Sequence, residues 1–470
     1  MKARLSIGIA SVLTILLAVW LSSAQATSNS DIGPKSEAWN ISYVSTNPDA
    51  GRHLSMALDE QHDYAPWIAY YNQTYSSLMV AHYVGAGNGD CNSNDAWKCE
   101  QVDYVNGETK GLYTSIDTYP DTDPDPFFST WKVGVSYYDA SNRSLKYARY
   151  ACPLMGGCSW TISTVDSSAD ASDELGRYTS IKYDSNGTAH ISYHVISDSI
   201  DPTRMEMVKY ASYIGGGDGN CGDDNNWMCQ VIAEAFNMSI GKYTSLDLDW
   251  ENKPYISFYD GTYGNLWYAY YVGSGGDCGS GGDWECRFID DNDSADVGMY
   301  SSLHAPQNED DYLRVAYYNS TAGTLMYAYD ISGTGDCGEN LEWLCTPVDE
   351  IGAGLTQAAI SLAVNPDNET LIAYTDGHAE MAPLGLKVAS PAIDMPYANC
   401  GGELFFSFYC RTVDNGYQDI HEAQSAALAI RPNGLAVIAY SELDQSDYPA
   451  QVNLKVAYQM ARTLLPLVVK

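Results

Sequence analysis

The sequence predicts an all-β fold, a closed ring of seven copies of one four-stranded antiparallel unit. Three observations lead to this prediction. Short runs alternate apolar and polar residues, as half-buried strands do. Gly, Asn and Asp separate these runs, which indicates hairpin turns. The whole four-run pattern recurs about every 60 residues along the chain.

The clearest copy runs from residue 241 to residue 290. Its runs read GKYTSLDLD, KPYISFYD and NLWYAYYVG, followed by a glycine-rich loop and WECRFID. Because short turns join consecutive strands, the four runs of one copy form an antiparallel meander. The first strands of the seven copies are predicted to begin at His53, Tyr113, Tyr178, Tyr243, Tyr300, Gln357 and Gln424.

Only six of the copies carry a fourth strand of their own. The seventh copy ends its third strand near Met460, and a strand-like run at Trp39–Val44 precedes the first copy. We predict that this N-terminal strand completes the seventh copy and closes the ring, which removes open sheet edges. The ring then spans residues 38–460, after a linker over 27–37. The apolar tail 461–470 is either a sorting element or a packed terminus.

Residues 1–26 have the pattern of a secretory signal peptide. Lys2 and Arg4 give a basic start, an apolar run extends to Leu21, and small residues at Ala24-Gln25-Ala26 mark a cleavage site. An uncleaved membrane anchor is the alternative. No second long apolar run follows, so the mature chain is predicted to be secreted or at the cell surface, without a membrane span.

Composition narrows the class of partner. The formal net charge is −36, from 60 acidic and 24 basic residues. Nucleic acids and anionic membranes attract clustered Lys and Arg, so this charge argues against both as partners. Apolar residues make up 45%, with 38 Tyr and 11 Trp, which excludes a disordered chain. The acidic excess either solvates an exported surface or binds cations.

Twelve cysteines fall into six pairs, each between the third and fourth strands of one copy. The recurring place favours six local disulfides, in agreement with export through an oxidising compartment. Metal binding is the alternative, but two thiols per copy without a nearby His do not complete a tetrahedral site. The pairs are Cys91 and Cys99, Cys152 and Cys158, Cys221 and Cys229, Cys278 and Cys286, Cys337 and Cys345, and Cys400 and Cys410.

With these repeats, the chain resembles a seven-bladed β-propeller over essentially all of the mature sequence. The motifs are Tyr-Thr-Ser-(Ile/Leu) in first strands, (Ser/Ala)-Tyr-Tyr-Asp in second strands and Leu-Lys-Tyr-Ala in third strands, and they look most like those of secreted bacterial propellers. The Asp box of sialidases and the GH–WD signature of WD40 repeats are absent. Because propellers host lectins, hydrolases, lyases and scaffolds, the resemblance implies a fold and leaves the function open.

One position of the first strands differs from copy to copy, two residues after the motif serine. Asp117, Lys182, Asp247 and His304 occupy it in four adjacent copies. Carboxylates beside a Lys and a His can bind a ligand or a cation, or transfer protons. A hydrated channel lining with balanced charges is the structural alternative. The full set of positions is Ala57, Asp117, Lys182, Asp247, His304, Ser361 and Leu428.

Two further candidates come from other positions of the chain. His194 follows Tyr193 in the second strand of the third copy, and some propeller polysaccharide lyases use a His and a Tyr, but ordinary packing is the alternative. Asp121, Asp123 and Asp125 have the spacing of calcium-loop ligands. That loop lacks the glycine and the final acidic residue of the known motif, so calcium is a possible cofactor without a convincing site.

Together these observations predict a secreted, monomeric, non-enzymatic binding or surface-scaffold protein whose ligand is a glycan or a protein. A polysaccharide-active enzyme, either a hydrolase or a lyase, is the alternative. Its site would lie at the channel mouth, with His194, Tyr193 and His304 as catalytic candidates.

Overall fold

The chain divides into residues 1–35 and residues 36–470, and the fold described here belongs to the second unit. The predicted signal peptide, the linker and all but the first residue of the tail lie outside the described residues. The computed structural model describes residues 38–45, 47–91, 95–119, 132–152, 157–198, 204–291, 294–355, 358–377, 385–392, 398–401, 407–415, 425–444 and 451–461.

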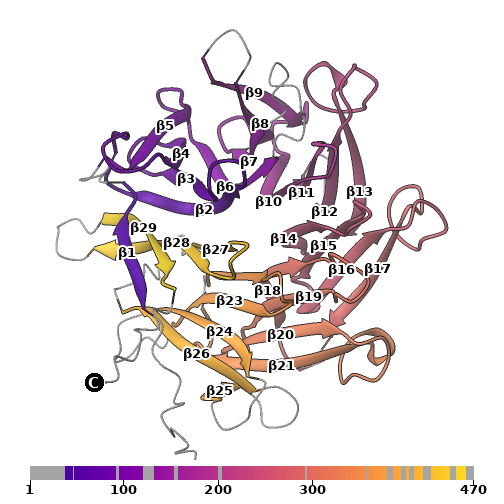
Figure 1. The fold of residues 1–470 in the computed structure, drawn as a ribbon. Helices are drawn as coiled ribbons and strands as arrows, with labels where there is room; N and C mark the ends of the chain where they lie inside the picture. Colours follow the sequence, from indigo (N-terminus) through magenta and orange to yellow (C-terminus); the bar gives the residue numbers. More distant parts are fainter. Residues whose placement is uncertain are drawn as a thin grey trace, which may run out of the picture. The chain divides into compact units, whose positions relative to one another are not determined.

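Seven antiparallel sheets form the blades of a β-propeller, which confirms the predicted fold (Figure 1). The first strand of each blade contacts the first strands of the two neighbouring blades, so these strands surround the centre of the ring. Blade 1 has β2 (Ala50–Asp59), β3 (Ala65–Asn72), β4 (Ser77–Tyr83) and β5 (Trp97–Asp103). Blade 2 has β6 (Lys110–Tyr119), β7 (Lys132–Asp139), β8 (Ser144–Ala151) and β9 (Ser159–Asp166). Blade 3 has β10 (Glu174–Tyr183), β11 (Ala189–Ser197), β12 (Met205–Tyr213) and β13 (Trp227–Phe236).

The remaining blades follow the same order from inside to outside. Blade 4 has β14 (Ile240–Leu248), β15 (Pro254–Asp260), β16 (Asn265–Tyr271) and β17 (Trp284–Asp290). Blade 5 has β18 (Val297–His304), β19 (Arg314–Asn319), β20 (Thr324–Asp330) and β21 (Trp343–Glu350). Blade 6 has β22 (Ile360–Val364), β23 (Thr370–Thr375), β24 (Leu386–Ala392) and β26 (Ser407–Asp414), with the short β25 (Cys400–Gly401) beside β26. Blade 7 has β27 (Ala426–Ile430), β28 (Ala436–Asp444) and β29 (Gln451–Gln459), completed by β1 (Trp39–Tyr43). Two 3-10 turns, η1 (Asp223–Asn225) and η2 (Glu339–Leu341), precede the outer strands of blades 3 and 5.

The N-terminal strand closes the ring, as the sequence predicts. β1 pairs antiparallel with β29 in a register that runs from Trp39 opposite Gln459 to Tyr43 opposite Lys455. Directly after β1, Val44 is fully buried in a core cluster that joins blade 7 to blade 1. The outer edge of β29 is therefore covered, and the last blade is locked to the first.

All six predicted disulfides are present. Five bridges tie the loop after a third strand to the fourth strand of the same blade, and the Cys152–Cys158 bridge closes the loop just before β9. Trp97, Trp227, Trp284 and Trp343 begin four of these fourth strands and are about 1% exposed. They belong to core clusters against which the bridged cysteines pack. Among the described residues, no helix is long and apolar enough to cross a membrane.

The first strands of blades 1 to 5 begin three or four residues earlier than predicted, because a bulge interrupts their alternation. β6, for example, begins at Lys110 rather than Tyr113, and its register with β7 shifts on either side of Leu112. Gly111 makes the approach possible, since a Cβ there would lie 2.6 Å from the Cα of Leu78 in blade 1. The bulged residues have φ of 50–57°, unusual for side chains larger than glycine; they are His53, Tyr113, Tyr178, Tyr243 and Tyr300.

Serine hydroxyls link the first strands around the ring. Ser115, for example, accepts the backbone N–H of Ile181 in the next blade at 3.1 Å. Equivalent bonds of 2.9–3.2 Å are accepted by Ser55, Ser180, Ser245, Ser302 and Ser361.

These bonds correct the predicted alignment in blades 6 and 7. Ser361 is equivalent to the motif serine, and its partner Leu428 stands one residue after that position. The residues that correspond to Asp117 are therefore Ala363 and Ala429, as the pairing with the second strands also shows. The error arose because β22 and β27 lack the bulge on which the sequence alignment relied. The predicted starts Gln357 and Gln424 lie outside the described residues.

Candidate functional site

The variable position on the first strands forms a chain of charges across blades 2 to 5. Lys182 Nζ lies 3.5 Å from Asp247 Oδ1, and His304 Nδ1 lies 3.6 Å from Asp247 Oδ2. Lys182 also interacts with Asp117, although burial outweighs this charge and raises the pKa of Asp117. The charge of Asp247 raises the pKa of Lys182 despite burial. The four predicted residues thus lie together, with the two carboxylates on either side of Lys182.

Much of this cluster is already engaged in holding blades together. Asp117 accepts the backbone N–H of Tyr183 at 2.7 Å, and Asp247 accepts that of Ala305 at 2.9 Å. His304 Nε2 lies 2.8 Å from Asp311, so both ring nitrogens of His304 face carboxylates. Burial opposes ionisation of Asp311, but hydrogen bonds from His304 and the N–H of Gln307 lower its pKa to about 2. These contacts neutralise one another and hold neighbouring blades together. They favour a structural role over proton transfer to a substrate.

The pair in blade 3 is enclosed. His194 and Tyr193 are both 0% exposed. His194 Nε2 lies 3.2 Å from Glu206, and the Tyr193 hydroxyl donates to Asp166 at 2.5 Å. Burial opposes ionisation of Glu206, yet hydrogen bonds from His194 and Arg204 lower its pKa to about 2. In this conformation neither His194 nor Tyr193 can touch a polysaccharide.

The described residues contain no convergent group of side chains that would bind a metal ion. Asp121, Asp123 and Asp125 lie outside them. Within them, the grouping with metal-ligand spacing is Asp336 with Cys337 and Cys345, but both sulfurs belong to one disulfide. Disulfide sulfurs are poor ligands compared with thiolates, so this grouping is explained by the bridge. Calcium stays a prediction.

The bulged aromatic residues form what we call the tyrosine collar: His53, Tyr113, Tyr178, Tyr243 and Tyr300. Neighbouring rings have centroids 4.4–4.8 Å apart. The collar lines a cavity of about 210 Å³ at the centre of the ring, and blades 6 and 7 contribute small residues such as Ala359 and Ala426 instead. It lies near the beginning of the first strands, roughly 13 Å along them from the charge cluster.

The collar makes one pH effect testable. Burial, with the charge of Arg52, lowers the pKa of His53 from its usual 6.5 to about 4. The unfolded chain therefore takes up this proton first, and stability is lost as the pH falls from 6.5 toward 4. The substitution His53→Tyr installs the residue of the four other collar positions and removes this titration.

Between pH 7 and pH 4, we expect the His53→Tyr variant to lose about 2–3 kcal/mol less stability than the wild type. Urea denaturation at each pH measures the difference. Glu206 and Asp311 also make stability depend on pH, because their pKa values are lowered. Both proteins contain them, so this contribution cancels in the difference between the two losses of stability. Equal losses in the two proteins would contradict the lowered pKa of the half-buried His53.

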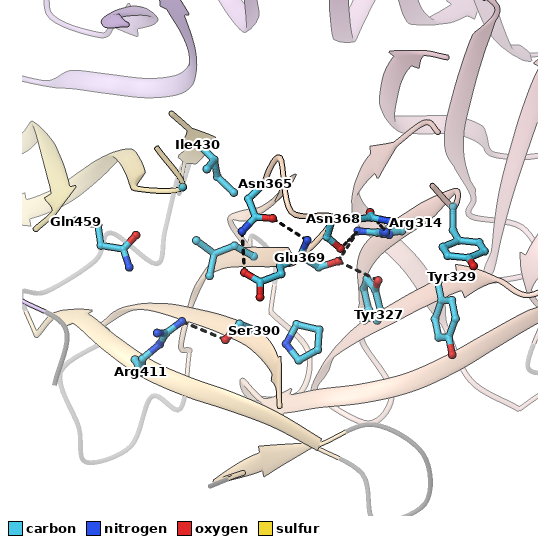
Figure 2. A pocket seen from close by; sticks show the side chains of 15 residues that line it. Arg314, Tyr327, Tyr329, Asn365, Asn368, Glu369, Ser390, Arg411, Ile430 and Gln459 are labelled. Carbon is cyan, nitrogen blue, oxygen red and sulfur yellow. Dashed lines mark hydrogen bonds between the residues drawn. The ribbon is translucent and has the colours of Figure 1, made fainter. Parts of the chain in front are cut away.

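A second cavity lies between blades 5, 6 and 7, and we call it the blade 5–7 pocket (Figure 2). Its volume is about 420 Å³. Blade 5 contributes aromatic rings, the β22–β23 hairpin contributes amide and carboxylate groups, and blade 7 closes the far side. The lining residues used below are Tyr312, Tyr327, Tyr329, Asn365, Glu369, Ser390 and Arg411.

Arg314 holds this pocket in shape. Its side chain is buried, with 5% of the residue exposed. The guanidinium donates to Asp311 at 3.0 Å, to the Thr370 hydroxyl at 3.1 Å and to the backbone oxygen of Asn368 at 3.3 Å. Arg314 thus fixes the β22–β23 hairpin of blade 6 against blade 5, and Figure 2 shows it next to Asn368 of the hairpin.

The polar groups that face the pocket are also fixed before any ligand arrives. Asn365 donates to the Glu369 carboxylate at 2.8 Å and accepts the Glu369 N–H at 2.8 Å. Arg411 donates to the Ser390 hydroxyl at 3.2 Å and stacks over the Tyr409 ring. Ligand groups that bind to such a surface lose less free energy to ordering of the protein.

Aromatic rings form one wall of the pocket. The rings of Tyr327 and Tyr329 are stacked, with centroids 5.9 Å apart and an interplanar angle of 23°. Tyr312, which precedes β19, is 51% exposed.

Sequence reasoning missed the pocket because its residues come from three blades. The available signal was Arg314, which stands where aligned second strands have Gly134, His190 and Tyr255.

No protein-family model and no curated protein sequence matches the chain. Among solved structures, it is similar to a protein of unknown function from Dyadobacter fermentans, with 8% identity, a TM-score of 0.45, and coverage of 91% of this chain and 99% of that one. It is also similar to a polysaccharide lyase, with 10% identity, a TM-score of 0.44 and coverage of 94% and 96%. A mutant of AofleA from Arthrobotrys oligospora has 10% identity, a TM-score of 0.42 and coverage of 81% and 91%. Similarity at this level gives no argument about function. A function must therefore be argued from the residues of this chain.

Proposed function

We propose that the protein is an extracellular carbohydrate-binding propeller that holds a glycan in the blade 5–7 pocket without cleaving it. The observation that carries the proposal is the pairing of an aromatic wall with fixed planar polar groups in one cavity. The six disulfides support an extracellular setting, because such bridges persist in oxidising compartments.

The chemistry of a sugar ring suits this lining. One face of a pyranose carries C–H groups, which pack against aromatic rings such as Tyr329, while its edge carries neighbouring hydroxyls. The Glu369 carboxylate and the Arg411 guanidinium can accept from or donate to two hydroxyls at once. A largely apolar cavity with a few placed polar groups is also the usual form of a small-ligand site.

The enzyme alternative places a hydrolase or lyase site at the channel mouth. His304 with Asp311 is the arrangement that favours it, because a carboxylate that orients a histidine is common in acid–base catalysis. The second contact of His304, with Asp247, opposes it, since no ring nitrogen then faces a substrate. Turnover measurements separate the two functions.

The test is a glycan array with the oxidised protein, followed by titration of the strongest glycan. We expect Tyr329→Ala to weaken binding about tenfold, because stacking contributes on the order of 1.5 kcal/mol. Tyr270→Ala is the matched control: Tyr270 occupies the same place in blade 4 and stacks on Tyr268 at 5.8 Å. The control should bind as the wild type does.

Two results would overturn the proposal. One is an equal loss of binding in Tyr329→Ala and in Tyr270→Ala, which would place the ligand elsewhere. The other is release of shortened or unsaturated sugar products from the bound polysaccharide. In that case His304→Ala tests the enzyme alternative, which requires turnover to disappear while the protein stays folded.

A further inference from the structure

One polar link recurs at five of the seven junctions between neighbouring blades, and apolar residues replace it between blades 3 and 4. A tyrosine of the second strand donates its hydroxyl to the aspartate that ends or nearly ends the fourth strand of the preceding blade, at 2.5–2.7 Å. The pairs are Tyr137 with Asp103, Tyr193 with Asp166, Tyr317 with Asp290, Tyr374 with Asp349 and Tyr440 with Asp414.

In blade 4 both partners of this link are replaced together. Phe258 stands at the tyrosine position, and Ala233 stands at the aspartate position of blade 3. The third-strand residue opposite this position changes as well. In blade 3, Lys209 stands opposite Tyr193 and forms an ion pair with Asp166, whereas in blade 4 Trp267 stands opposite Phe258. Replacement of all three groups leaves an apolar site where blades 2, 3, 5, 6 and 7 have the tyrosine–aspartate hydrogen bond.

The replacement lines a cavity of about 690 Å³, which we call the blade 3–4 pocket. Phe258, Trp267 and Phe288 stand opposite one another on β15, β16 and β17, so their side chains form one aromatic row on the same face. The rings of Trp267 and Phe288 meet edge to face, with centroids 5.8 Å apart. The disulfide loop of blade 4 reaches over blade 3, where Gly279 N–H donates to Ile232 O at 2.9 Å.

Two carboxylates, Asp260 and Glu234, border this aromatic row without an ion pair among the described residues, whereas Glu339 on the rim pairs with Arg287 at 3.2 Å. Asp260 lies two residues after Phe258, on the same side of β15, and is 8% exposed. It accepts the backbone N–H of Thr262 at 2.9 Å. Its equivalent in blade 2, Asp139, is bound by Lys110 at 2.9 Å. Among the described residues, no Lys or Arg pairs with Asp260 or with Glu234, which also lines the pocket.

Two further observations indicate that polar groups in the pocket are left for a ligand to pair with. Burial raises the pKa of Asp260, which shows that its negative charge is incompletely compensated. The indole N–H of Trp267 is buried and has no hydrogen-bond partner among the described residues. A ligand with a positive group and a flat apolar body would satisfy the carboxylate and cover the rings.

We propose that the blade 3–4 pocket binds an organic cation, an ammonium group carried on an aromatic or aliphatic body. The ammonium group pairs with Asp260, and the body packs against Trp267 and Phe288, where ring faces also attract positive charge. This site is separate from the blade 5–7 pocket, so it does not depend on the proposed carbohydrate binding. The net charge of −36 favours a cationic ligand in general.

The experiment compares 2-phenylethylamine with the neutral, nearly isosteric 2-phenylethanol by calorimetric titration of the full chain in 0.15 M salt. We expect the amine to bind at least tenfold more tightly than the alcohol. The double substitution Ala233→Asp with Phe258→Tyr rebuilds the link of the sibling blades and fills the pocket, so amine binding should fall at least tenfold.

A second variant covers the case in which the double variant does not fold. Asp260→Asn keeps the acceptor for Thr262 but removes the charge, and should lower amine affinity at least tenfold while leaving alcohol binding unchanged. Glu309→Gln removes one exposed charge elsewhere and controls for non-specific attraction. The proposal is overturned if amine and alcohol bind equally, or if Asp260→Asn and Glu309→Gln have the same effect.

Discussion

Reduction of the six disulfides is expected to unfold the protein in the absence of denaturant. The bridged cysteines are 6 to 10 residues apart. In the loop-entropy model each such bridge contributes about 2–3 kcal/mol, mainly because it restricts the unfolded chain. Six bridges together contribute about 15 kcal/mol, which is comparable with the whole stability of a typical domain of 5–15 kcal/mol.

Fluorescence of the buried tryptophans Trp97, Trp227, Trp284 and Trp343 reports the change, with guanidinium titrations of the oxidised and the reduced protein. A thiol assay must show that all twelve cysteines are reduced. Replacement of Cys152 and Cys158 alone by serine is the graded control, and should cost about 2 kcal/mol. An unchanged unfolding midpoint in the fully reduced protein would contradict the stabilising role of the bridges.

Removal of the closing strand β1 is the second change with a large expected effect. A chain that begins at residue 46 lacks the ladder with β29 and the buried Val44, whereas a chain that begins at Ala38 retains both. Loss of the buried Val44 alone costs about 1.5–3 kcal/mol, and loss of the partly buried Trp39 and Ile41 adds to it. We expect a difference of at least about 4 kcal/mol between the two chains in denaturant unfolding.

The same truncation exposes the outer edge of β29. An open edge offers unpaired N–H and C=O groups to other chains. The chain that begins at residue 46 should therefore associate with increasing concentration, as light scattering after size-exclusion chromatography would show. The chain that begins at Ala38 is the control. Equal stability and equal mass for the two chains would show that β1 does not lock the ring.

The blades and the closure of the ring could be predicted because their signals are local. Alternation and turn residues mark each strand, and the orphan run at Trp39 matches the missing strand of the last copy. The collar bulges could not be read the same way, because Tyr113 adopts a positive φ that its own side chain does not favour. Gly111, two residues earlier, was the available signal.

The candidate sites were predictable only where neighbouring copies differ at one aligned position. That comparison found Lys182 and Asp247, which the structure places 3.5 Å apart. It failed for the blade 5–7 pocket, since Tyr329 and Arg411 come from different blades and meet only in the folded ring. The paired change of Phe258 and Ala233 is visible in the sequence, but its meaning depends on knowing that the two positions touch across blades.

The pairing of β1 with β29 also constrains when the protein can finish folding. Trp39 stands opposite Gln459, so the first strand of the ring waits for almost the last residues of the chain before it gains a partner. Contacts between residues so far apart in sequence are slow to form. Blades 1 to 6 hold all of their own strands and can fold as the chain emerges, whereas blade 7 is completed last. Until then the edge of β1 is open, and the interval between synthesis and closure is the period in which this chain is most exposed to association with others.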